Sequence, residues 1–134
     1  MKEVYREKSI DTFSNEQCIF KPTSWIEIEG VPRPVTFKVV TEDLQSLGLR
    51  KNPNIMTFIV GEWVSLLDDE LSVGKDDRGG IWSALKFSGA KTLTTYMWEK
   101  YNRRTRMFLT AIDNPLYANS YRVKSQGVFL IKEM

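Results

Sequence analysis

Residues 79–112 read GGIWSALKFSGAKTLTTYMWEKYNRRTRMFLTAI and decide the fold. Apolar residues recur every three or four positions over residues 88–101, which predicts a helix with one buried face. The residues on this face are Ala90, Leu93, Met97 and Tyr101, with Trp98 beside them. Residues 105–112 are apolar on both faces, which is typical of a central strand. The pair Gly79-Gly80 allows an unusual backbone path just before Trp82.

The segments on either side of this stretch predict further strands. Alternating apolar and polar residues indicate strands at 25–29 and 35–40, the second with Thr36 and Lys38 on its outward face. Pro32 and Pro34 predict a break between the two strands, because proline cannot donate to a ladder. The apolar run 55–60 predicts a strand covered on both faces. Residues 116–124 and 127–132 predict a C-terminal hairpin around a turn at 125–127.

A short helix is predicted at residues 41–47. Thr41 can cap its start, two acidic residues favour its first turn, and Gly48 can end it in the left-handed conformation. Together these elements predict an α+β fold. It has one mixed or antiparallel sheet of about five to seven strands, a main helix at 88–101 and the short helix at 41–47.

Length and composition predict one domain at residues 25–134, preceded by an irregular arm at 1–24. The chain has 134 residues, of which 42% are hydrophobic and 27% charged, as in a globular protein. No apolar run is long enough to cross a bilayer, and the charged N-terminus lacks the apolar core of a signal peptide. The single cysteine, Cys18, agrees with a reducing compartment. We therefore expect a cytoplasmic protein without a membrane partner.

The absence of histidine limits the chemistry that this chain can perform. The sequence contains none, which excludes Ser-His-Asp and Cys-His triads and the common zinc ligand sets. The acidic loop 68–78 carries its carboxylates in two clumps, so their spacing does not match a calcium loop. We therefore expect no metal and no cofactor. The net charge of +2 is too small to indicate a nucleic-acid partner by itself.

Two groups of residues are candidate sites. The first is a pocket with Trp82 as one wall, entered past the glycine pair. Its candidate ligand-binding residues are Arg50, Asn52, Glu62, Asp77, Trp82 and Tyr96. The second is a set of basic turns with tyrosines and tryptophans nearby, a combination that suits single-stranded nucleic acid. Its candidate contacts are Arg103, Arg104 and Arg122.

The order of elements over residues 35–132 resembles the ADP-ribosyltransferase-like fold. The resemblance lies in Gly48-Leu49, Gly80-Ile81-Trp82, the helix at 88–101 and the strand at 105–112. It implies an enzyme that acts on NAD or another nucleotide. Arg50 would hold phosphate, Trp82 or Tyr96 would stack on a ring, and Glu62 or Asp77 would polarise a hydroxyl. The chain departs from the family's catalytic patterns, because it has no histidine and no Ser-Thr-Ser strand. In addition, Arg33 precedes the predicted strand, and Glu133 lies at the extreme C-terminus.

Three functional hypotheses follow from the sequence. The first is a non-catalytic module that binds a ligand or a partner, because no complete catalytic set can be assembled. The second is an enzyme that acts on NAD or a nucleotide. The third is a small nucleic-acid-binding protein. The sequence leaves the ligand, the partner and the oligomeric state open.

Overall fold

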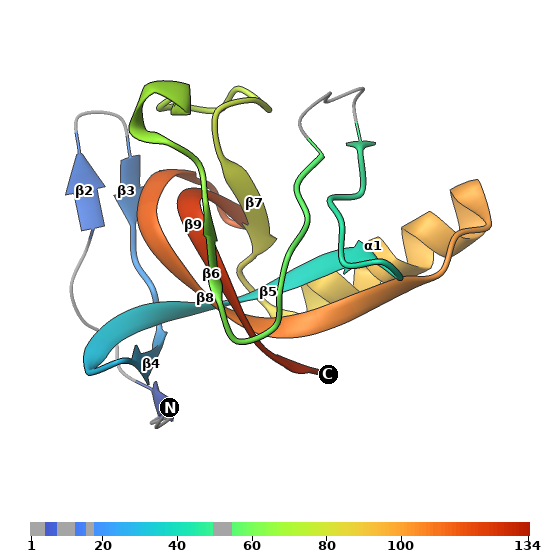
Figure 1. The fold of residues 1–134 in the computed structure, drawn as a ribbon, viewed down its shortest axis with the longest axis horizontal. Coiled ribbons are helices and arrows are strands. Elements are labelled where there is room, and N and C mark those ends of the chain that lie inside the picture. The colour runs from blue at the N-terminus through green and yellow to red at the C-terminus, as the bar shows by residue number, and fades with distance from the viewer. Residues whose placement is uncertain (1–4, 8–12, 16–17, 50–54) are drawn as a thin grey trace.

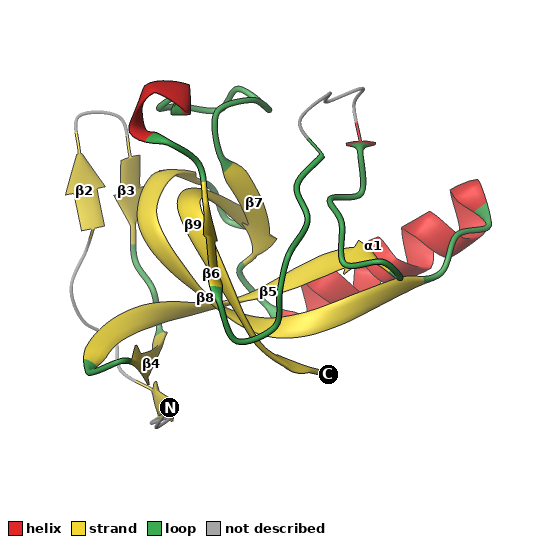
Figure 2. Ribbon diagram, viewed as in Figure 1, coloured by secondary structure: helices red, strands yellow, loops and turns green. Residues whose placement is uncertain are grey.

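The computed structural model describes residues 5–7, 13–15, 18–49 and 55–134. It shows an α+β fold in which one main helix packs beside a curved sheet (Figures 1 and 2). The elements are β1 (Tyr5–Glu7), β2 (Phe13–Asn15), β3 (Cys18–Phe20), β4 (Ser24–Ile28), β5 (Val31–Thr41), β6 (Trp63–Ser65), a 3-10 turn (Asp68–Glu70), β7 (Ile81–Ala84), α1 (Phe87–Tyr101), β8 (Thr105–Ala118) and β9 (Arg122–Glu133).

The sheet confirms the predicted fold class. Among the described residues it contains seven strands, and each pairing between them is antiparallel. The long strands β5, β8 and β9 form the centre of the sheet, and β8 pairs with both of the others. The short strands β2 and β3 form a separate hairpin. No helix in the described residues is long and apolar enough to cross a membrane.

The predicted break at the two prolines is wrong. β5 begins at Val31 and runs through Pro32 and Pro34, which lie opposite Glu27 and Trp25 of β4. Proline is tolerated where a strand has a neighbour on one side only, because the missing N–H then removes no ladder bond. The pairing of β5 with β8 begins at residue 35, just past the second proline.

The C-terminal hairpin is formed by β8 and β9, not by the predicted strands at 116–124 and 127–132 with a turn at residues 125–127. Those residues lie inside β9, and the turn falls at residues 119–121. There Asn119 Oδ1 accepts hydrogen bonds from the backbone N–H groups of Tyr121 and Arg122, at 2.8 and 2.9 Å. β8 continues past Asn114, whose φ is +50°, by a local shift in its pairing with β9. Residues 113–115, which separate the predicted strands 105–112 and 116–124, therefore lie inside one continuous strand.

Residues 41–47 do not form the predicted short helix. They turn the chain at the end of β5, with Leu44 in the left-handed conformation at φ +61°. The Leu44 carbonyl accepts the N–H of Phe58 at 2.7 Å, and Ser46 N–H donates to the Met56 carbonyl at 3.0 Å. These long-range bonds use backbone groups that a helix would have paired locally.

Residues 55–60 do not form the predicted strand. The segment makes two isolated bridges, from Thr57 to Gln45 and from Val60 to Leu130. Phe58 is buried, whereas Ile59 is 53% exposed. The run is apolar because one side chain enters the core and others line a cavity or its edge, not because two layers cover it.

Helix α1 begins at Phe87, one residue before the predicted start. It buries Ala90 and Met97, as predicted, against β5, β7 and β8. Asn102 ends it at φ +51° and donates its N–H to the Trp98 carbonyl at 2.9 Å. Tyr101, predicted on the buried face, is 50% exposed. The last turn of α1 extends past the ends of β5 and β8, so the strands do not cover it (Figure 1).

Both faces of β5 are covered, which corrects the outward placement of Thr36 and Lys38. One face packs into a cluster with Val35, Leu109 and Ala111. The other carries Thr36, Lys38 and Val40, with exposures of 0%, 9% and 0%. The Thr36 and Thr110 hydroxyls lie 2.6 Å apart across β5 and β8 and satisfy each other. The predicted N-terminal arm also contributes to the core, because Phe20 is 3% exposed.

Thr110→Val is expected to destabilise the chain by about 1–3 kcal/mol, because it leaves the buried Thr36 hydroxyl without its partner. The double variant Thr36→Val/Thr110→Val is expected to be closer to the wild type, since no orphaned hydroxyl remains. Urea denaturation of the three proteins gives the free energies of unfolding. A double variant that is less stable than Thr110→Val would contradict this account.

Candidate functional site

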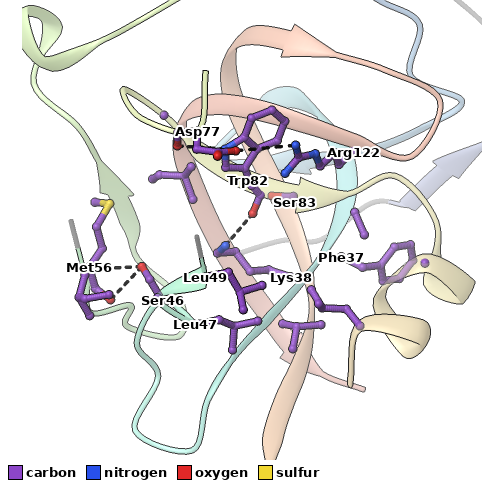
Figure 3. Close-up of a pocket in the computed structure, with 18 of the residues that line it drawn as sticks. Phe37, Lys38, Ser46, Leu47, Leu49, Met56, Asp77, Trp82, Ser83 and Arg122 are labelled. Atoms are coloured by element: carbon purple, nitrogen blue, oxygen red, sulfur yellow. Dashed lines mark hydrogen bonds and ion pairs between the residues drawn. The ribbon is translucent and has the colours of Figure 1, made fainter. Parts of the chain in front are cut away.

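A cavity of about 410 Å³ lies between β5, β7, the start of α1 and the segments 46–49 and 55–56 (Figure 3). This volume is typical of a small-molecule site. Much of its lining is apolar and comes from the two segments that were predicted to be a helix and a strand. These residues include Leu47, Leu49, Ile55 and Met56. The hydrogen bonds between Ser46 and Met56 hold the two segments together as one wall.

Lys38 is the buried charge of this cavity. Its ammonium donates to the Trp82 carbonyl at 2.6 Å and lies 5.3 Å from the centre of the Phe58 ring. Among the described residues that carbonyl is its one hydrogen-bond acceptor, although an ammonium has three donors. Burial lowers the pKa of Lys38 to about 8. The group therefore still carries its charge at neutral pH, in surroundings that favour the neutral form.

Trp82 forms one wall of the cavity and is held in place by its neighbours. Its indole N–H donates to the Asp77 carbonyl at 3.2 Å. The Arg122 guanidinium lies over the indole ring, 3.8 Å from its centre, and 3.8 Å from an Asp77 carboxylate oxygen. Tyr117 approaches the ring edge-on, with the ring centres 6.0 Å apart. One face of Trp82 is thus covered by Arg122 and not open for a ligand to stack on.

The glycine pair makes room for Lys124, which holds the loop that carries Asp77 in place. Lys124 is fully buried, and its ammonium donates to the Asp76 and Arg78 carbonyls at 2.9 and 3.1 Å. Burial lowers the pKa of Lys124, and the charges of Asp76 and Asp77 oppose this effect. The stem of Lys124 passes so close to Gly80 that a Cβ there would overlap it. Gly80 is therefore needed for this close approach.

Ser83 of β7 also lines the cavity. Ser83 is 4% exposed, and its hydroxyl is buried without a hydrogen-bond partner among the described residues. A buried hydroxyl without a hydrogen-bond partner lowers the stability of the folded chain. Such a group is therefore typical of a position where a ligand or a water molecule binds.

The structure brings some of the predicted site residues together and separates others. Asp77, Trp82 and Arg122 line the cavity, and Arg122 had been assigned to a nucleic-acid surface. Other predicted residues lie outside this lining: Glu62, Tyr96, Arg103 and Arg104. Arg50 and Asn52 fall outside the described residues. Arg33 and Glu133 pair with Asp113 and Arg106, each at 2.8 Å, and do not line the cavity.

Sequence reasoning missed Lys38, Ser83 and Lys124. Lys38 alternates with apolar neighbours and so has the pattern of an exposed lysine. One signal could have placed it inside, because Val40 lies on the same face of the strand. Lys124 gives no local signal, since its partners are backbone carbonyls 46 and 48 residues away.

Within the residues that the structure describes, no group of three or more acidic, cysteine or histidine side chains could hold a metal ion. No protein-family model, curated protein or solved structure matches this chain. The function is therefore inferred from the cavity and its charged groups.

Proposed function

We propose that this protein is a non-catalytic module that binds a small apolar carboxylic acid in the cavity beside Lys38. The observation that carries the proposal is the buried Lys38 ammonium, which reaches a largely apolar cavity and has one described acceptor. A buried cation is stabilised when an anion pairs with it. A carboxylate would provide one negative charge and two acceptor oxygens for the unused donors of Lys38.

The remaining lining supports an apolar body for this acid. Leu47, Leu49 and Ile55 offer hydrocarbon surface, and burial of such surface provides the larger part of the binding energy of small ligands. One carboxylate neutralises the Lys38 ammonium that lines the cavity, so a monoacid matches the cavity better than a polyphosphate. Arg122 adds a second cation to the lining, but Asp77 and Trp82 already contact it.

Thermal unfolding with a panel of ligands tests the proposal. The panel contains medium-chain fatty acids and aryl carboxylates, each with its neutral primary amide, together with NAD and nucleotides. We expect at least one acid to raise Tm by several degrees, since a ligand at 100 times its Kd stabilises by about 2.7 kcal/mol. The matching amide should have little effect, because it brings no charge to Lys38.

Lys38→Met should abolish the effect of the acid, whereas Lys132→Met, at an exposed lysine, should retain it. Equal shifts from acids and their amides would contradict the role of Lys38. A shift produced only by NAD or nucleotides would favour the enzyme hypothesis instead. No shift from any acid would overturn the proposal.

A further inference from the structure

The exposed end of α1 is unusually rich in rings and cations. We call it the aromatic–basic surface, and it consists of Tyr96, Trp98, Lys100, Tyr101, Arg103 and Arg104. Its three rings are 40%, 50% and 50% exposed, in chain order. Monomeric proteins rarely leave several large rings together in solvent, so such a surface is typical of an interaction site.

The cations of this surface lie against its rings. Lys100 Nζ is 5.3 Å from the Tyr96 ring centre and 5.6 Å from that of Tyr101. Arg104 lies 6.0 Å from the Trp98 ring centre. No carboxylate forms an ion pair with these cations or with Arg103 in the described residues. The cations are therefore available to an anionic partner.

The last turn of α1 also carries one exposed carboxylate, Glu99, so this surface combines three cations with one acid. The acidic 3-10 turn at Asp68–Glu70 lies on the other side of the molecule's centre along the long axis from the last turn of α1 (Figure 1). Arg122, predicted as part of the same surface, pairs across the sheet with Ala84, before the start of the helix. Arg122 therefore lies near the start of α1, whereas Arg103 follows its end, and a helix of 15 residues is about 22 Å long at a rise of about 1.5 Å per residue. Arg106, the next arginine along the chain, does not contribute a free cation to this surface, because it is paired with Glu133.

We infer that the aromatic–basic surface binds single-stranded nucleic acid. The cations would meet the phosphates, and the exposed faces of Trp98 and Tyr101 would stack on unpaired bases. A duplex hides its base faces, so it could use the cations but not the rings. This surface is independent of the cavity at Lys38 and does not require the ligand proposed above.

Fluorescence anisotropy with labelled 12-nucleotide strands, in RNA and DNA forms, tests the inference. We expect binding at 50 mM salt that weakens with salt, with a log–log slope of about −2 for three phosphate contacts. Arg103→Ala/Arg104→Ala should reduce this slope by about 1.4. Trp98→Ala should weaken binding about tenfold, because stacking on one base is lost.

Lys75→Ala/Arg78→Ala is the matched control, because it removes two exposed cations elsewhere. It should bind as the wild type does. Absence of binding at 50 mM salt would overturn the inference. Equal binding of duplex and single strand, or equal loss in the control, would also overturn it, because attraction by net charge alone would then suffice. Self-association that Trp98→Ala abolishes, without strand binding, would assign the surface to a second copy of the chain instead.

Discussion

Gly80→Ala is expected to destabilise the chain by about 2–3 kcal/mol, as overpacking of a filled interior does. A methyl group at this position would overlap Cγ of Lys124 and come within 3.3 Å of Leu116 Cδ1. Lys124 cannot move freely, since its ammonium is held by the Asp76 and Arg78 carbonyls. Relief of the clash would therefore release the loop that carries Asp77. Urea denaturation measures the loss as a lower midpoint.

A double-mutant cycle with Lys124→Ala separates this clash from other effects. Gly80→Ala/Lys124→Ala should be more stable than the sum of the two single effects predicts, by 1 kcal/mol or more, because the clash needs both side chains. Gly89→Ala is the control for a glycine substitution. A Cβ there would meet Ala84 Cβ at an ordinary 3.8 Å, and alanine favours a helix by about 1 kcal/mol. Additive effects of Gly80→Ala and Lys124→Ala would contradict the proposed clash.

The sequence predicted the fold class because the long elements have strong local patterns. The face of α1 that carries Ala90 and Met97 repeats at helical spacing, and residues 105–112 of β8 are apolar on both faces of the strand. Turns were predicted less well. Residues 41–47 have every local signal of a helix, yet backbone bonds from Leu44 and Ser46 to the segment near Met56 replace it. Such bonds join residues ten or more positions apart, which a local pattern does not contain.

The candidate site could be predicted in part, through Asp77 and Trp82, because a glycine pair beside a tryptophan marks a close approach of backbone. Lys38 was missed as the central charge, because alternation alone assigns it to a solvated face and only Val40 on the same face argues against that assignment. Whether that face is solvated depends on the segment around Phe58, which lies over it and contacts its ammonium. Burial of Lys38 is therefore a tertiary property.

The stability of the wild type should rise relative to that of Lys38→Met as the pH increases from 8 to 10.5. Burial lowers the pKa of Lys38 in the folded chain to about 8, whereas the ordinary value is 10.5. Between these values the unfolded chain binds more protons, so deprotonation favours the folded state. The relative gain should approach 3 kcal/mol, because each pKa unit corresponds to about 1.4 kcal/mol.

Urea denaturation of both proteins at several pH values measures this gain, and groups common to both, including Asp77 and Arg122, cancel in the difference. Lys132→Met, at an exposed lysine, should show no such change. A difference in the free energy of unfolding between the wild type and Lys38→Met that does not change with pH would mean that burial does not lower the pKa of Lys38.

A bound acid should reduce the gain, because its carboxylate pairs with the ammonium and raises the pKa of Lys38. The acid should therefore protect the wild type most below pH 8 and progressively less above it. Protection that is independent of pH would place the ligand away from Lys38, even if the ligand binds in the same cavity.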